Sequence, residues 1–246
     1  MVSSVGTTTA STSLLSQAIA AAKSNAAANA ASASSSTSTS ASSSSSSLSS
    51  LGGNFNQFLT LLTTQLQHQD PSNPTSTDSF TAELAQFAGV QQQVETNTNL
   101  TSLISATQDN QMASAVSLIG KTTTASSSSL PLQSGSASLS FTAPQAEDVA
   151  IAVTDSTGTV VKSETVNVSA GTNTWTWDGK NNSGTQLSDG AYTVAVEGSS
   201  TDGTSVSLPT TITGTVTGVS KGITGVNIDM GDATIDMSDL TGFSTT

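Results

Sequence analysis

The sequence lacks several residue types on which enzymes and metal proteins depend. Its 246 residues include no cysteine, no arginine, one histidine and only 4% aromatic residues. Without cysteine the chain forms no disulfide, no thiolate zinc site and no cysteine nucleophile. The lone His68 has no second histidine and no cysteine with which to share a metal, so we expect it on the solvated face of a helix.

Charge is also scarce, and most of it is negative. Five lysines oppose 17 acidic residues, which gives a formal net charge of -12, and charged residues make up 9% of the chain. Proteins that bind nucleic acid or anionic membrane surfaces neutralise phosphates with clustered lysine and arginine. The composition therefore argues against both as partners.

Long hydrophobic runs are missing as well. No segment reaches the ~18 apolar residues of a membrane-spanning helix. Residues 1–22 carry no positive residue ahead of a mildly apolar stretch, which Ser16 and Gln17 interrupt, so they do not match a secretory signal peptide. We expect no membrane insertion, and we expect any export to proceed without a cleaved signal.

The sequence offers no pattern of catalytic or metal-binding residues. Serine is so abundant that its proximity to an aspartate carries no information, and no Gly-x-Ser-x-Gly elbow singles one out. One acidic cluster lacks the spacing and the closing glutamate of a calcium loop, so solvated strand ends explain it better. It consists of Asp229, Asp232, Asp236 and Asp239. We predict no enzyme activity, no cofactor and no metal site.

What the sequence does contain begins with a serine-rich leader. Residues 31–50 comprise 14 Ser, 2 Thr, 3 Ala and one Leu. This composition leaves almost nothing to bury against the entropy of ordering the chain. We expect residues 1–53 to be a disordered leader, and both a passive linker and a segment kept unfolded for export are compatible with it.

Two amphipathic helices are predicted over residues 54–114. Asn54 is a good N-cap, Asp70-Pro71 ends the first helix, and Thr77 or Asp78 begins the second. Apolar residues recur at three- and four-residue spacing. They are Phe55, Phe58, Leu59, Leu62 and Leu66, then Phe80, Leu84, Phe87, Val90 and Val94. The pattern allows the second helix to continue through Leu100, Leu103, Ile104 and Met112.

The polar faces of these helices carry Gln, Asn, Thr and Ser instead of the Glu/Lys pairs that stabilise a solvent-exposed helix. Helices of this kind depend on burial against other parts of the protein or against another chain. The two apolar stripes therefore either pack on each other or bind a partner, and the sequence leaves both possibilities open.

After about residue 115 the hydrophobic period changes to two, which is typical of β-strands. A first strand is predicted at residues 116–122. Alternating runs separated by Gly, Asn and Asp turns then predict an immunoglobulin-like sandwich over residues 136–199. Trp175 and Trp177 share one strand face, and core packing explains them better than a sugar-binding platform does.

Further strands follow residue 200, too few for a second sandwich. If the strand near Val116 pairs with them, the sandwich is an insertion in a small barrel-like unit made of residues 115–135 and 200–246. The predicted fold class is thus a disordered leader and amphipathic helices followed by an all-β region.

Three motifs, in this order, resemble bacterial flagellar hook-capping proteins. The first is a helix-turn-helix signature: FLTLLTTQLQHQDPSNP at residues 58–74, FTAELAQF at residues 80–87 and QQQVE at residues 91–95. The others are LIGK at residues 118–121, and WDGK at residues 177–180 followed by Gly184, Gly190 and Tyr192. The resemblance covers residues 54–246. The chain departs from the family in its long serine tract, its lack of arginine, and the Thr or Ser that flank the helices where charged residues are frequent.

The resemblance implies a tudor-like (SH3-like) barrel interrupted by an immunoglobulin-like (fibronectin-III-like) sandwich. It also implies export through the flagellar type III apparatus and a ring-like homo-oligomeric cap, a pentamer in the family, at the distal tip of the growing hook. There the cap would guide hook protein subunits into place and leave when the hook is complete.

We therefore predict assembly contacts on the helical segment, with the β module as a rigid plate. The predicted contact residues are Phe55, Phe58, Leu62, Leu66, Phe80, Leu84 and Phe87. The rival hypothesis is a secreted adhesin or carbohydrate-binding module, which would require an exposed aromatic platform at Trp175 and Trp177.

Overall fold

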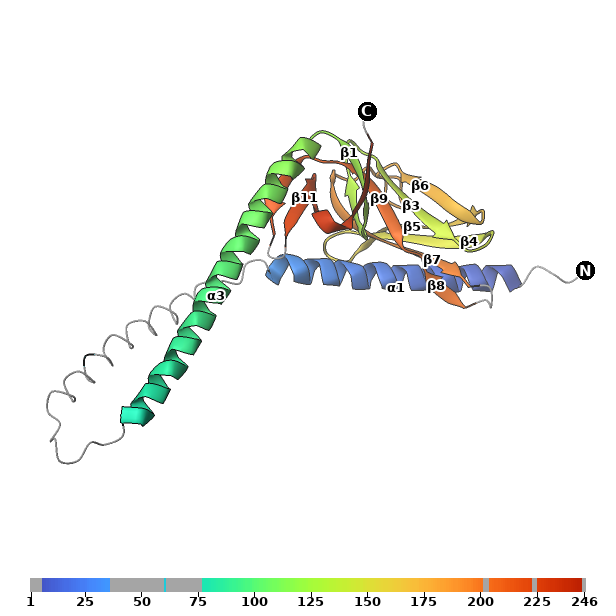
Figure 1. The fold of residues 1–246 in the computed structure, drawn as a ribbon. Helices are drawn as coiled ribbons and strands as arrows, with labels where there is room; N and C mark the ends of the chain where they lie inside the picture. The colour runs from blue at the N-terminus through green and yellow to red at the C-terminus, as the bar shows by residue number, and fades with distance from the viewer. Residues whose placement is uncertain (1–5, 36–59, 61–76, 201–203, 223–224, 245–246) are drawn as a thin grey trace, which may run out of the picture. The chain divides into compact units, whose positions relative to one another are not determined.

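The computed structural model describes residues 6–35, 60, 77–200, 204–222 and 225–244 (Figure 1). They fall into two compact units, one formed by residues 1–36 together with 108–246 and the other by residues 37–107. The first unit holds the N-terminal helix α1 (Gly6–Ser35) and the described strands. Segments from the two ends of the chain therefore build one module.

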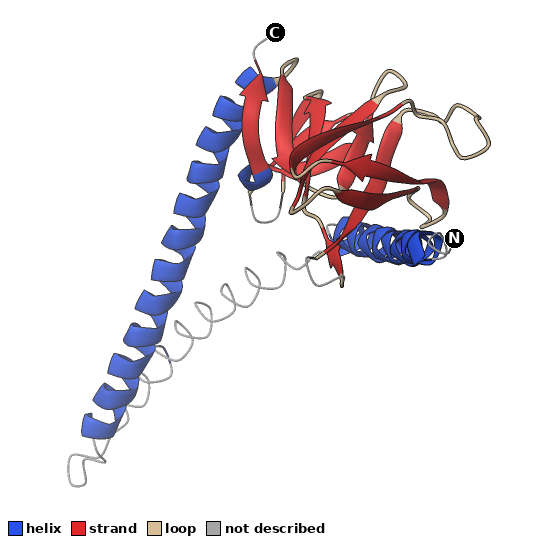
Figure 2. Ribbon diagram, turned by 90° about the vertical axis from the view of Figure 1, so that its right-hand side faces the viewer, coloured by secondary structure: helices blue, strands red, loops and turns tan. Residues whose placement is uncertain are grey.

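Three antiparallel sheets form the β region (Figure 2). The first sheet has the order β13-β1-β9-β3-β6, the second β2-β7-β4-β5 with β8 added beside β7, and the third β10-β11-β12. The strands are β1 Thr122–Ser126, β2 Ser129–Leu132, β3 Ala137–Ala143, β4 Glu147–Thr154, β5 Val160–Val168, β6 Gly171–Trp177, β7 Gly190–Ser199, β8 Ser205–Ser207, β9 Thr210–Thr215, β10 Gly218–Lys221, β11 Val226–Met230, β12 Ala233–Asp236 and β13 Leu240–Ser244.

The first two sheets share a hydrophobic core made of alternate residues from their strands. Leu139, Ile151, Val194 and Ile212 are 1% exposed or less, and the core extends to buried residues of β11 and β12. Trp175 and Trp177 are both buried, so the prediction that they belong to the core is confirmed. Buried rings offer no aromatic platform to a sugar.

Strand β1 pairs antiparallel with β9 and with β13, so a strand that precedes the sandwich pairs with strands that follow it. On its other side β9 pairs with β3, where Leu139 faces Ile212. One sheet thus runs from the sandwich into the flanking part.

The predicted position of the first strand was wrong. Residues Val116–Leu118 form a short 3-10 helix, η1, and the strand begins only at Thr122. Leu118 is buried whereas Val116 and Ile119 are exposed, and Gly120 turns the chain with φ 83°. Burial in this segment repeats at the three-residue interval of a 3-10 turn, at Ala115 and Leu118, and not at every second residue as in a strand.

The prediction of disorder was wrong for residues 6–35, which form α1. Its inward face repeats every four residues, at Leu14, Ala18, Ala22 and Ala26, and all four side chains are buried. Alanine has the highest helix propensity, and packing on a sheet compensates for the entropy of ordering. The rest of the predicted leader, residues 36–53, lies outside the described residues.

Helix α3 (Thr77–Ala115) confirms that the second predicted helix continues past Leu100 to Met112. Its residues up to 107 belong to the second compact unit, and those from 108 belong to the first. The predicted first helix, with Asn54 and His68, lies outside the described residues apart from Thr60.

The turn between β4 and β5 provides a test of the fold's dependence on pH. Partial burial alone would raise the pKa of Asp155, but hydrogen bonds from Thr157 Oγ1 and from the N–H groups of Thr157 and Thr159 outweigh it, so this pKa is lowered. The pKa of an aspartate in the unfolded chain is ~3.9. When folding lowers this pKa, the ionised carboxylate stabilises the fold fully at pH values above the unfolded pKa. That stabilisation is lost as the pH falls through the pKa of the folded state. We expect Asp155→Asn to reduce the loss of stability below about pH 4, measured by urea unfolding at a series of pH values.

Ser156→Ala is the matched control, because Ser156 is an exposed residue of the same turn. It should leave the acid dependence as in the original chain. Identical acid dependence for the original chain and Asp155→Asn would contradict the assignment.

Candidate assembly surface

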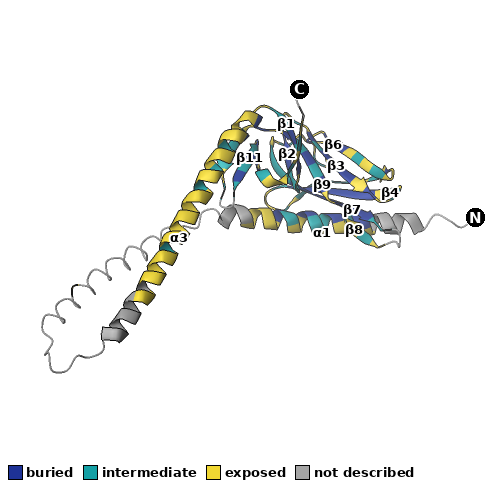
Figure 3. Ribbon diagram, viewed as in Figure 1, coloured by how far each residue is buried: buried dark blue, intermediate teal, exposed yellow. Residues whose placement is uncertain are grey.

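Helix α3 is exposed along most of its described length (Figure 3), and four of its large apolar side chains are exposed. Val90 is 42% exposed, Leu100 51%, Leu103 64% and Ile104 58%. Leu100, Leu103 and Ile104 are separated by three and four residues, so they lie on neighbouring turns of the helix. Large aliphatic side chains exposed together on one helix are typical of a surface that another protein covers.

The polar side chains around this apolar group are already hydrogen-bonded within the helix. The hydroxyl groups of Thr96, Thr98, Thr101, Ser102 and Thr107 each donate to the backbone carbonyl four residues earlier. Between residues 91 and 120 the only charged residues are Glu95 and Asp109. A partner can therefore cover this face while desolvating few charges.

The C-terminal end of α3 is fixed to the β module. Ala115 is buried, Leu118 follows it into the core, and Met112 packs against the same core. Asp109 Oδ1 forms an ion pair with Lys221 Nζ at 3.1 Å on the surface, where it adds little to stability. The helix is thus anchored at one end in a rigid support.

The structure places only some of the predicted contact residues. Phe80, Leu84 and Phe87 lie on α3, although their side chains are outside the described part. Phe55, Phe58, Leu62 and Leu66 lie outside the described residues altogether. The predicted set omitted Leu100, Leu103 and Ile104, which the hydrophobic spacing had already indicated as a continuation of the helix.

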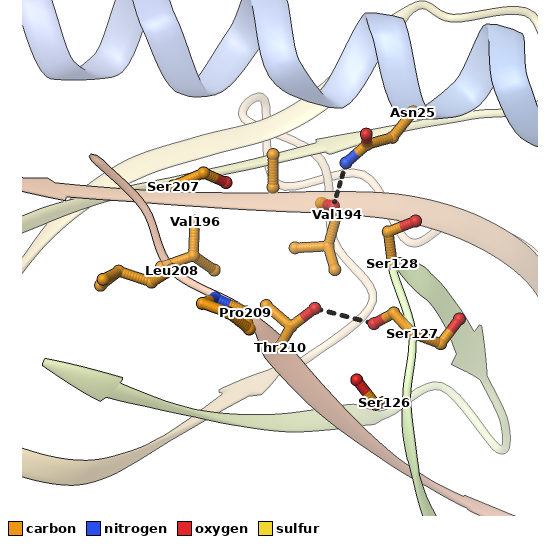
Figure 4. Close-up of a pocket in the computed structure, with 11 residues that line it drawn as sticks. Asn25, Ser126, Ser127, Ser128, Val194, Val196, Ser207, Leu208, Pro209 and Thr210 are labelled. Atoms are coloured by element: carbon orange, nitrogen blue, oxygen red, sulfur yellow. Dashed lines mark hydrogen bonds between the residues drawn. The ribbon is translucent and has the colours of Figure 1, made fainter. Parts of the chain in front are cut away.

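A shallow cleft lies beside α1 (Figure 4). Asn25 Nδ2 donates to Val194 O at 3.4 Å across one side, and Thr210 Oγ1 donates to Ser127 O at 2.7 Å across the other. The remaining lining consists of small hydroxyl and aliphatic residues, with no charged group among them. The cleft has neither the general base nor the positive charge that a catalytic or anion-binding site needs.

Two of the four acidic residues after position 228 accept hydrogen bonds within the β region. Asp229 Oδ1 accepts hydrogen bonds from Ser220 Oγ and Thr234 Oγ1, and Asp236 Oδ1 accepts from the N–H and hydroxyl of Ser238 at the start of a 3-10 turn. Within the described ranges, no three His, Cys, Asp or Glu side chains come together as a metal site would require. The described helices also include none with the length and apolarity needed to cross a bilayer.

The loop that begins at Trp177 is a turn that joins strands of different sheets. Asn181 Oδ1 accepts from the N–H groups of Ser183 and Thr185, and Gly184 has φ 82°. The preceding β6 belongs to the first sheet and the following β7 to the second. The loop therefore connects the two layers of the sandwich.

The described residues form a β module with a buried core and a helix with exposed apolar side chains and few charges, which is typical of a structural assembly protein. Two family models match the chain: "Flagellar hook capping protein - N-terminal region" over residues 25–102 and "FlgD Ig-like domain" over residues 126–202. The second match confirms the immunoglobulin-like sandwich.

Known relatives agree with the family models. The basal-body rod modification protein FlgD of Salmonella typhimurium is 32% identical over 177 residues, which cover 68% of this chain and 76% of that protein. Its Escherichia coli counterpart is 32% identical over 154 residues, or 58% of this chain and 67% of that protein. The crystal structure of FlgD from Xanthomonas campestris is 26% identical, with a TM-score of 0.47 over 55% of this chain and 99% of that chain.

The chain belongs to the family of flagellar hook-capping proteins. This is a family of structural proteins and not a known class of enzymes.

Proposed function

We propose that this chain is a hook-assembly scaffold, which acts at the distal tip of the growing flagellar hook and promotes the addition of hook protein subunits. The observation that supports it most directly is the exposed apolar face of α3, on a helix anchored to a rigid β module. A scaffold of this kind needs a firm part that holds its place and a compliant part that lets each new subunit pass.

The partners in this proposal are hook protein subunits, further copies of this chain in a ring-like cap of five, and the flagellar type III export apparatus. The protein would be made in the cytoplasm, exported without a cleaved signal peptide and released when the hook is complete. The strands that flank the sandwich would correspond to a tudor-like barrel, because β1 pairs with β9 and β13 across the inserted sandwich.

The contact surface in this proposal joins the residues predicted from the sequence with those exposed in the structure. It comprises Phe55, Phe58, Leu62, Leu66, Phe80, Leu84 and Phe87, together with Leu100, Leu103 and Ile104. The rival role as a sugar-binding adhesin gains no support, because both tryptophans are buried in the sandwich core.

Deletion of the gene tests the proposal. We expect the mutant bacterium to make basal bodies without hooks and to release unpolymerised hook protein into the medium, because subunits that arrive at an uncapped tip diffuse away. Electron microscopy of isolated basal bodies and immunoblotting of the medium measure the two effects. Supplying the chain from a plasmid should restore hooks, whereas hooks of normal length in the deletion strain would refute the role.

A further inference from the structure

Helix α1 lies along the outer face of the second sheet, over β4 and β7 (Figure 1). Ala18 and Ala22 of the helix, both 0% exposed, form a separate apolar cluster with alanines of the sheet. The sheet residues in this cluster are Ala150, Ala152 and Ala195. We call this alanine-lined face the α1 seat.

The seat is built from small side chains on adjacent strands. Ala152 of β4 faces Ala195 of β7, and Thr154 faces Thr193 in the next position. All four side chains are buried, although they point away from the sandwich core. Antiparallel sheets commonly leave one face in water, with polar residues there. Small residues on both partners let a helix approach the strands closely, so this face is suited to a helix.

Three of the hydrogen bonds between α1 and its seat are long. Asn25 Nδ2 donates to Val194 O at 3.4 Å, Asn29 Nδ2 to Thr193 Oγ1 at 3.3 Å, and Thr154 Oγ1 to Ala22 O at 3.3 Å. These distances are at the long end for hydrogen bonds. Lys23 is the only charged residue of α1, and no ion pair of the described residues includes it. The contact therefore rests mainly on small apolar side chains.

The connection between α1 and its seat is long. All of residues 37–107 separate the two parts of the first compact unit. A long connection lowers the effective concentration at which a segment meets its own binding site. An identical copy offers an identical seat, so α1 loses no contact by binding there, and the balance between the two sites depends only on chain entropy and protein concentration.

We propose that the α1 seat accepts α1 from a second copy of this chain, which links neighbouring copies by exchange of their N-terminal helices. The inference adds a contact between copies to the proposed scaffold, and it concerns the purified chain whatever that scaffold meets at the hook.

The natural absence of cysteine makes the exchange measurable. One full-length variant carries Asn29→Cys and a second carries Thr193→Cys, the two positions whose side chains are hydrogen-bonded. The two purified variants are mixed at increasing concentration and oxidised with a glutathione redox buffer, and products are resolved on non-reducing gels. We expect a disulfide-linked species that contains one chain of each variant and grows with concentration at least fivefold above the control.

The control replaces Asn29→Cys by Ser24→Cys, an exposed position on the same helix. The intramolecular double variant with both Asn29→Cys and Thr193→Cys reports whether α1 occupies its seat at all. Closure of this double variant without any cross-link in the mixture would show docking within one chain only and would overturn the proposal. Absence of both products would overturn it too, because α1 would not occupy the seat. Neither result would change the outcome of the gene deletion, so the two proposals fail separately.

Discussion

A strain that carries Leu103→Asp together with Ile104→Asp is expected to release hook protein without building hooks. The two side chains are 64% and 58% exposed, so the substitutions disturb little within the described part of the protein. In an assembled cap the same positions would meet a partner, and a carboxylate buried there without a counter-ion costs several kcal/mol. A loss of that size weakens binding by about a thousandfold or more.

Hook length in electron micrographs and hook protein in the medium measure this effect, and thermal unfolding of the purified variant measures the fold. The matched control is Asn99→Asp with Asn110→Asp, which adds two negative charges at exposed positions of α3 and leaves the apolar side chains in place. It should support hooks of normal length. Normal hooks in the Leu103/Ile104 variant would show that this face makes no essential contact.

Trp177→Ala is expected to destabilise the β module by about 3–5 kcal/mol, because removal of a fully buried tryptophan leaves a cavity in the core. Trp177 is 1% exposed, its ring meets Tyr192 edge-on at 5.0 Å, and its Nε1 donates to Lys180 O at 2.9 Å. The substitution removes the ring contact and the hydrogen bond that holds the start of the loop between the two layers.

Urea unfolding followed by fluorescence measures this loss. Trp175 is then the only tryptophan left, and it reports on the same strand, β6. Val206→Ala, at a residue that is 38% exposed, serves as the control and should change the free energy of unfolding by less than about 1 kcal/mol. An equally small change for Trp177→Ala would contradict its place in the core.

Spacing alone identified the elements whose burial repeats with a regular period. The three- and four-residue spacing from Phe80 to Met112 predicted α3, and alternation such as Val149, Ile151 and Val153 predicted the strands of the sandwich. The buried tryptophans followed from size, since a small sandwich has few other large residues. These features depend on local sequence, so local reasoning was enough to find them.

Helix α1 and its seat were not predicted, because each is buried only by contact with the other. Serine and alanine in the leader indicated disorder when they were weighed without a sheet to cover. A signal was nevertheless present in β4, where the run Val149–Thr154 alternates between large and small side chains and not between apolar and charged ones. Such a run is typical of a strand with both faces covered, and the sandwich explains only one of them.

For the exposed residues of α3, the sequence predicted the helix but not the exposure. Their spacing showed that they share a helix, but exposure depends on what else packs against that helix, which no local pattern records. The identity of the hook-capping family came from a longer stretch, in which motif order carries information that composition lacks.

The strand order of the first sheet also determines when its strands can pair. Strand β1 lies between β9 and β13, and β13 follows all the other described strands in the chain. Pairings between distant segments wait for the later segment, and they are slow to form. A polypeptide delivered from its N-terminus therefore carries β1 with both edges open until residues 210–215 emerge, and with one edge open until residues 240–244 follow. Completion of the first sheet therefore waits for the last described strand, which suits the export that we propose for this chain.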